Sequence, residues 1–314
     1  MSSGNILPKG KTGGYLALVT TSVLWGTTWV ASKVAVSENL PPFQMASIRQ
    51  FSGGCCFLLF FMVFKKLPLP TLRQFGWLLV LGLLMFVFAN GLSTWSLKYI
   101  PTGLSALIGA LYPFSVVIIE RIFFKSRNLN LLTLVGLLLG IIGVGIVFYE
   151  HLFHEQPTGF LFGVILSVGA MLSWSAGTMF IARNKLNLNP YYSTGWQMLI
   201  SSVILFIISQ TSQPVIPLRE VSLRIWLSIA YLVAFGSLIS FIAFIYSMKK
   251  LPTAISSLYA YVNPLVAMVT AAILLNEKLT MNILWGAIVT LVGVFLVNYS
   301  IKRNTEKIIA EPEQ

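Results

Sequence analysis

Charged side chains are scarce in this sequence, and aspartate is absent altogether. Only 10% of the 314 residues are Asp, Glu, Lys or Arg, far below the roughly 25% of soluble globular domains. Hydrophobic residues make up 56% of the chain, and its mean hydropathy is +0.83. This composition excludes a water-soluble globular domain and indicates a chain that lies mostly in lipid.

Cysteine and histidine are equally sparse, with two of each. Cys55 and Cys56 are adjacent within one apolar run, cannot easily bridge to each other, and are expected only to pack. His151 and His154 share one loop with two glutamates, a spacing more typical of a solvated loop than of a metal site. A membrane enzyme needs a concentrated set of Asp, Glu, His or Cys side chains. We therefore expect no catalytic activity, no metal and no other cofactor.

Apolar runs of about twenty residues dominate the chain, and this is the length that a helix needs to cross ~30 Å of hydrocarbon. The first run follows Lys9 and Lys11, is too long for a signal-peptide core, and is expected to remain as a span. The sequence thus predicts an all-α polytopic membrane protein with ten transmembrane helices. They are expected near residues 15–36, 43–64, 75–98, 102–124, 131–149, 158–183, 191–210, 223–248, 252–275 and 281–300.

Lysine and arginine are distributed unevenly between the two sides of this bundle. Fifteen of the 21 basic residues fall on one side and four on the other, while Lys33 and Arg49 lie within helix ends. Because positively charged loops stay in the cytoplasm during insertion, we expect a multi-pass protein of the cytoplasmic (inner) membrane with both termini cytoplasmic. The basic residues are spread one to three per loop rather than clustered, so membrane lipid is an expected partner and nucleic acid is not.

The two halves of the chain repeat each other. Residues 100–107 (Ile-Pro-Thr-Gly-Leu-Ser-Ala-Leu) match 251–258 (Leu-Pro-Thr-Ala-Ile-Ser-Ser-Leu) at an offset of 151, and Trp25 matches Trp174 at an offset of 149. Such self-similarity indicates a duplicated five-helix unit. The expected division is a cytoplasmic tail over 1–14, one repeat over 15–149, its copy over 158–300 and a cytoplasmic tail over 301–314.

A five-helix repeat has an odd number of spans, so the second copy is expected to enter the membrane from the opposite face. Two inverted repeats create a site at the midplane between them, and rocking one set against the other exposes that site alternately to each side. The pattern therefore favours a secondary transporter of a small-molecule metabolite. A channel is the alternative, although channels usually build a filter from symmetric subunits or charged rings.

Several short sequence patterns resemble the drug/metabolite transporter superfamily, and specifically its EamA-like branch. They are Trp25-Gly26, the two Pro-Thr-x-x-Ser-x-Leu segments, Asn263-Pro264, and Asn276-Glu277-Lys278. The first half departs from this pattern at 125–127, where Lys-Ser-Arg replaces a small residue and Glu. The resemblance implies export or exchange of metabolites such as amino acids, through a central cavity lined by spans 1, 3, 4, 6, 8 and 9. It does not select a substrate.

Polar and aromatic residues at membrane depth are costly unless they face a wet cavity or a neighbouring helix. Trp25 and Trp174 occupy equivalent positions, so symmetry predicts opposite walls of one cavity, whereas Trp29 is equally compatible with packing. An amide at Asn90 must bond to another helix or to substrate, and one or two of Tyr246, Tyr259 and Tyr261 are expected to be interfacial aromatics. The candidates for substrate binding are Trp25, Thr28, Trp29, Asn90, Tyr112, Trp174, Tyr246, Tyr259 and Asn263.

A second set of residues concerns gating and coupling. Pro113 and Pro264 each free a backbone carbonyl four residues earlier, where it can bind a ligand, water or side chain. Lys33 and Arg49 can form a cationic vestibule for a carboxylate or phosphate, or either can pair with Glu38 or extend to the interface. Glu120 is the candidate for proton coupling, and a helix-end ion pair is its plainer interpretation.

Two further features are expected to be structural. Glu277 falls at an outer turn, where a glutamate beside a helix end usually orders the loop. Glycines at 136, 140, 143 and 145 permit close helix contact in the fifth span, either as internal packing or as the seam of a homodimer.

Overall fold

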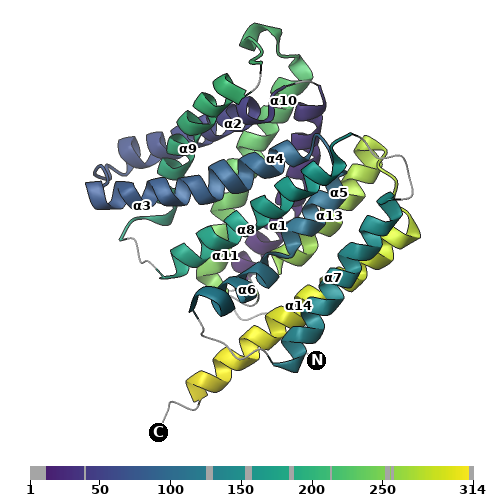
Figure 1. Cartoon of the computed structure of the whole chain (residues 1–314). Helices are drawn as coiled ribbons and strands as arrows, with labels where there is room; N and C mark the ends of the chain where they lie inside the picture. The colour runs from purple at the N-terminus through teal and green to yellow at the C-terminus, as the bar shows by residue number, and fades with distance from the viewer. Residues whose placement is uncertain are drawn as a thin grey trace, which may run out of the picture.

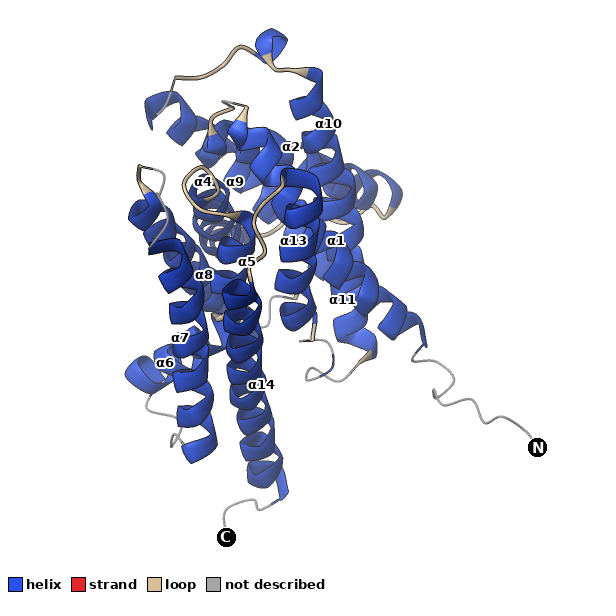
Figure 2. Cartoon of the chain, turned by 90° about the vertical axis from the view of Figure 1, so that its right-hand side faces the viewer, coloured by secondary structure: helices blue, strands red, loops and turns tan. Residues whose placement is uncertain are grey.

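The computed structural model describes residues 12–38, 40–124, 130–152, 158–183, 187–212, 214–251, 255 and 258–310. All regular secondary structure in these residues is helical (Figure 2). The first half contains α1 (Thr12–Ser37), α2 (Pro42–Leu59), η1 (Phe60–Phe64), α3 (Leu72–Gly82), η2 (Leu83–Gly91), α4 (Leu92–Ser96), α5 (Thr102–Ala110), α6 (Tyr112–Phe124) and α7 (Leu131–Leu152). The second half contains α8 (Phe160–Arg183), α9 (Pro190–Ser212), η3 (Leu218–Glu220), α10 (Leu223–Tyr231), η4 (Leu232–Ile239), α11 (Ser240–Lys250), α13 (Tyr259–Leu275) and α14 (Met281–Ala310).

Among the described residues, eight helical stretches are long and apolar enough to cross a membrane, and α13 is a shorter apolar helix. The first helix, α1, has 26 residues but is not among the eight, because its buried face carries Thr21, Ser22, Thr28 and Ser32. It packs inside the bundle against α5, α10, α11 and α13, so it does not need an apolar surface on every side. With α1 and α13 included, the predicted all-α membrane fold with ten spans is confirmed.

The spans have symmetric neighbours. Spans 5 and 10 (α7 and α14) pack together, as do spans 2 and 7 (α2 and α9). Span 1 (α1) packs against spans 8 and 9 (α11 and α13), and span 6 (α8) packs against spans 3 and 4 (η2 and α5–α6). Exchanging each span for its counterpart in the other half reproduces these pairs, as the predicted repeat requires. In Figure 2, α1 begins and α14 ends toward the same lower side of the bundle.

The pair formed by α7 and α14 lies side by side in both views (Figures 1 and 2). A Cβ atom added at Gly143 would lie 2.4 Å from the backbone nitrogen of Thr290, and one added at Gly293 would lie 2.5 Å from the backbone nitrogen of Gly140. Only glycine allows the two backbones to approach this closely. These glycines therefore serve internal packing. Gly145 has open space around its Cβ position, and a homodimer stays a prediction.

Among the described residues, the interruptions within spans 3, 4, 8 and 9 come in symmetric pairs, whereas η1 at the end of span 2 has no counterpart in α9. Spans 3 and 8 each contain a π-helical segment, η2 and η4, that begins at an equivalent position at an offset of 149 residues. Span 4 breaks at Leu111 between α5 and α6, and its counterpart, span 9, holds Pro264 inside α13. Irregular turns of this kind often mark functional sites within helices.

The described helix ends differ from the prediction most at the C-terminus. The apolar part of the last span ends at Ser300, but α14 continues as a helix to Ala310. Lys, Arg and Glu in this segment are good helix formers, which explains why the helix continues beyond the apolar residues where a tail was expected. Residues 125–127, where the sequence departs from the family pattern, lie outside the described residues, as do residues 252–254, 256 and 257 of the repeated segment.

Candidate functional site

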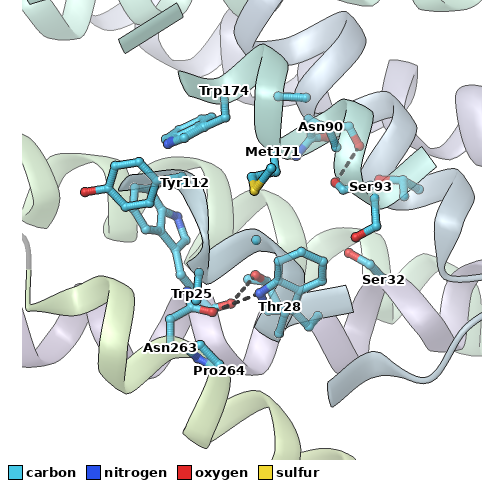
Figure 3. A pocket seen from close by; sticks show the side chains of 18 of the residues that line it. Trp25, Thr28, Ser32, Asn90, Ser93, Tyr112, Met171, Trp174, Asn263 and Pro264 are labelled. Carbon is cyan, nitrogen blue, oxygen red and sulfur yellow. Dashed lines mark hydrogen bonds between the residues drawn. The ribbon is translucent and has the colours of Figure 1, made fainter. Parts of the chain in front are cut away.

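A cavity of about 190 Å³ lies between the two halves of the chain (Figure 3). Its wall is formed by α1, η2, α4, α5, α6, α8, α11 and α13, which belong to spans 1, 3, 4, 6, 8 and 9. These are the spans that the resemblance implies. One further wall residue, Arg49, comes from α2 in span 2.

The cavity brings together eight of the nine residues that the sequence proposed for substrate binding. Tyr246 is the exception, because its side chain is 39% exposed and its ring lies against Gly13 and beneath the ammonium group of Lys250. The eight residues in the wall are Trp25, Thr28, Trp29, Asn90, Tyr112, Trp174, Tyr259 and Asn263.

Only some of the candidates for gating and coupling line the cavity. Arg49 and Pro264 line the cavity, as do Gly109 and Ala260, whose carbonyls were expected to be freed by the two prolines. Lys33 and Pro113 are not among the wall residues. Glu120 belongs to α6, but its side chain lies outside the described part of the structure.

The aromatic part of the wall is centred on Trp25. Its ring lies 6.4 Å from that of Trp174, centroid to centroid, in an edge-to-face arrangement, and 5.4 Å from the ring of Tyr259. Its Nε1 donates a hydrogen bond to the carbonyl oxygen of Gly236 at 3.1 Å. The two equivalent tryptophans were expected on opposite walls, but they meet within one aromatic cluster that joins α1, α8, α11 and α13.

Two asparagines from different halves contribute amides to the wall. Asn263 Oδ1 accepts a hydrogen bond from Trp29 Nε1 at 2.9 Å, which joins α13 to α1. Asn90 Oδ1 accepts one from Gln50 Nε2 at 3.0 Å. Within the described chain, neither amide nitrogen donates a hydrogen bond to another residue. The cavity therefore presents two amide donors.

One side of the cavity carries small polar side chains, while the aromatic side also carries the amide of Asn263. Figure 3 shows Asn90 with the hydroxyls of Ser32 and Ser93 on one side, and the rings of Trp174 and Tyr112 on the other. A ligand with a polar group at one end and an apolar body would match this division.

Arg49 brings a guanidinium group to this wall and is only 6% exposed. Its Nε donates to Ser237 Oγ at 3.1 Å, and a Cβ atom added at Gly236 would lie 2.9 Å from its Nη2. The glutamates whose side chains are described are engaged elsewhere: Glu38 with Arg224, Glu220 with Arg219, and Glu277 with the start of α5. In the described chain, Arg49 thus lacks an anionic partner.

Lys33 and Glu277 instead organise the outer corner of the bundle. Lys33 Nζ donates to the carbonyl oxygens of Leu97 at 2.5 Å and Ile100 at 3.1 Å, at the end of span 3. The carboxylate of Glu277 accepts hydrogen bonds from the backbone N–H and the hydroxyl of Thr102, at 2.9 and 2.6 Å. A negative charge is favourable at a helix N-terminus, so Glu277 caps α5. The proposed vestibule therefore does not include Lys33.

Several small polar and apolar wall residues were not predicted from the sequence. One signal was available, because Trp25, Thr28, Trp29 and Ser32 follow the i, i+3, i+4, i+7 spacing of one helix face, and all four line the cavity. Other wall residues that were not predicted supply hydroxyl groups or apolar surface: Met85, Ser93, Thr94, Ser167, Met171 and Phe241.

A ten-span helical bundle with symmetric halves, and with a polar and aromatic cavity where they meet, defines the class of membrane transporters built from inverted repeats. The model of the EamA-like transporter family matches this chain twice, at residues 12–149 and 161–299. The chain therefore belongs to the EamA-like transporter family and is a multi-pass membrane transporter.

Relatives cover nearly the whole chain. It is 30% identical to the uncharacterized inner membrane transporter YedA of Escherichia coli (strain K12) over 274 residues, which cover 87% of this chain and 86% of YedA. It is 22% identical to the uncharacterized transporter YoaV of Bacillus subtilis (strain 168), with 92% and 97% covered. A solved crystal structure of a protein with 16% identity shares the fold, with a TM-score of 0.65 and coverage of 92% and 98%.

Proposed function

We propose that this chain is a secondary transporter that moves a small metabolite, an amino acid or a related compound, across the cytoplasmic membrane by alternating access. The observation that carries the proposal is the cavity, because its wall takes residues from both halves of the chain. Inverted-repeat transporters place their substrate site at such an interface. We further propose export as the direction and cytoplasmic positions for both termini, on the basis of the unequal distribution of basic residues and the family resemblance.

The aromatic cluster and the paired interruptions support movement around the cavity. Trp25 from α1 and Trp174 from α8 are in contact across the interface between the halves. The break at Leu111 and the proline at 264 lie in equivalent spans beside the cavity. Helix interruptions where backbone faces a cavity are characteristic of transporter sites. Rocking of one half would change the width of the cavity at these points.

The test is transport into proteoliposomes with a panel of labelled amino acids, sugars and nucleosides, with and without a pH gradient. Wild type would be compared with Trp174→Ala and Asn90→Ala, and with Gly145→Ala as a matched control away from the cavity. We expect counterflow of at least one panel member, with loss in the two cavity variants and retention in the control. A dependence on the pH gradient would assign proton coupling, with Glu120 as the first residue to test.

The contrary outcomes are equally specific. Absence of uptake and counterflow for every panel member, in protein that is monodisperse, would contradict the transporter proposal. Conduction of ions without counterflow would favour a channel. Equal activity of wild type and both cavity variants would place the substrate elsewhere in the bundle.

A further inference from the structure

Arg49 places a charged guanidinium group in the buried interior of a membrane helix bundle. Arg49 is the one charged residue among the wall residues of the described cavity, and only 6% of its surface is exposed. An ionised side chain at this depth is expensive unless another group compensates its charge. Ser237 Oγ accepts one hydrogen bond from it. A neutral hydroxyl does not neutralise the charge.

Nothing else that faces the guanidinium in the described chain is anionic. Its close neighbours are Gly236 and Ser237 of η4, and Thr28 of α1, whose methyl group approaches the same Gly236 position. Lys33, the other cation predicted nearby, is bound to backbone carbonyls and does not line the cavity. The wall therefore carries a single positive charge.

The architecture itself does not require a cation at this position. The equivalent helices α2 and α9 begin at Pro42 and Pro190, an offset of 148 residues, and at this offset Arg49 corresponds to Gln197 of α9. Gln197 is buried, donates a hydrogen bond to Ser193, and is not a wall residue. The same place in the other repeat is thus filled by an uncharged side chain, which indicates that the charge of Arg49 serves a ligand rather than the packing of spans 2 and 7.

The remaining polar groups of the wall suit an anion as well. The amide nitrogens of Asn90 and Asn263 are hydrogen-bond donors without described acceptors, because both amide oxygens accept bonds from the protein. A single guanidinium matches one carboxylate, which it binds with two parallel N–H···O bonds. A phosphate dianion would need a second cation, and the wall offers none among the described residues.

We propose that Arg49 binds the carboxylate of the transported metabolite, and that the aromatic rings around Trp25 and Trp174 receive its apolar body. This inference rests on the proposed transport function and names the substrate class of the same cavity: monocarboxylates with an apolar or aromatic body. No carboxylate lines the described wall, so a substrate ammonium group would meet only uncharged groups, namely ring faces, hydroxyls and carbonyls. The carboxylate is therefore required, and an amine is not.

The first test compares matched ligands on the purified full-length protein. The probes are 3-phenylpropionate, its neutral amide 3-phenylpropanamide, L-phenylalanine and phenethylamine, with 4-methylpentanoate and its amide as an aliphatic pair. Binding is followed through intrinsic tryptophan fluorescence, because three tryptophans line the cavity, and through counterflow in proteoliposomes. We expect at least one carboxylate to bind about tenfold more tightly than its amide, and phenethylamine to bind most weakly.

The second test removes or displaces the guanidinium. Arg49→Gln, which copies the residue of the other repeat, should abolish the preference for carboxylate over amide, and Arg49→Lys should retain part of it. Gly236→Ala should reduce it without removing the charge, because the new Cβ would lie 2.9 Å from Arg49 Nη2. Arg219→Met, which changes a side chain that is 86% exposed, should leave the preference unchanged.

Each contrary result has its own meaning. If the wild-type protein does not prefer any carboxylate to its amide, the assignment of Arg49 is overturned even when the variants fail to fold. If phenethylamine, a sugar or a nucleoside undergoes counterflow and the carboxylates do not, Arg49 is not the anchor but the transport function stands. If no compound of either panel binds or is transported, both proposals fail together. A full carboxylate preference in folded Arg49→Gln would also overturn the assignment.

Discussion

The two halves of this transporter are alike where helices pack and different where the cavity is lined. The close contacts of α7 with α14 use glycines from both repeats, such as Gly143 and its counterpart Gly293. In the cavity, by contrast, Trp25 and Trp174 correspond, but Arg49 has the uncharged Gln197 as its counterpart. Duplication thus supplies the scaffold twice, while the charge offered to a ligand comes from the first repeat.

Physical constraints explain this contrast. A close backbone approach accepts only glycine on either helix, so both copies of the seam must keep it. A cavity wall has no such steric requirement, and one anionic group needs only one guanidinium. The following substitutions test whether the scaffold is as symmetric, and the cavity as asymmetric, as the structure indicates.

The largest effect is expected at the glycine seam. Gly143→Leu and Gly293→Leu place side chains where even a Cβ atom would lie within 2.4–2.5 Å of the facing backbone. Overpacking that side chains can relieve costs about 1–3 kcal/mol. A clash with backbone cannot be relieved by a rotamer change, so the cost here should exceed that range and also the cost of truncating a buried tryptophan. Both variants should lose most folded protein to a similar extent, measured as monodisperse yield after purification. A large effect in only one of them would contradict the symmetry, and Gly145→Leu is the control.

Truncation of the two equivalent tryptophans should separate stability from transport. Trp25 is buried, packs against Trp174, Tyr259 and Phe241, and donates a hydrogen bond to Gly236. Trp25→Ala should therefore lower the free energy of unfolding by about 3–5 kcal/mol. Trp174→Ala should cost less stability and mainly reduce transport, because its ring is only half-buried. Thermal unfolding and counterflow, measured on both variants, would test this difference. Equal losses of stability would contradict it and show that the two tryptophans contribute equally to the fold.

A smaller loss is expected at the outer corner. Glu277→Gln removes the negative charge that caps α5 through Thr102 and Gly103. Loss of a helix N-cap typically costs about 1 kcal/mol. The first repeat has Ser126 at the equivalent place, so this contribution belongs to the second repeat. Thermal unfolding would check it against Glu220→Gln, a change at an exposed ion pair, and equal melting temperatures would argue against the capping role.

The smallest effect is expected at the amide that joins α1 to α13. Asn263→Ala removes the acceptor for Trp29 Nε1 and should cost about 0.5 kcal/mol of stability, at the low end for a hydrogen bond, since a donor near the cavity can still reach water. Asn263→Asp keeps an acceptor and should retain the bond. A similar thermal shift in both variants would show that the loss comes from packing of the side chain and not from the hydrogen bond.

Much of the fold was predictable because lipid imposes simple rules. Span length, basic loops and the internal repeat are properties of local sequence, and they predicted the helical fold and ten spans. Eight of nine binding candidates line the cavity because polar or aromatic residues at membrane depth have few other places to lie. Tyr246 was misplaced because an aromatic residue near a helix end has the same sequence signal whether it faces a cavity or the surface.

The sequence could not determine which of Lys33 and Arg49 faces the cavity. Both are single cations near the outer ends of neighbouring spans, and nothing in their local sequence separates them. The sequence determined that two such charges enter the bundle and that the chain repeats. Only the tertiary structure decided that Lys33 meets the carbonyls of Leu97 and Ile100 while Arg49 reaches the cavity. The reason is that the rotation of each helix, and hence the direction of its side chains, is set by packing against helices distant in the sequence.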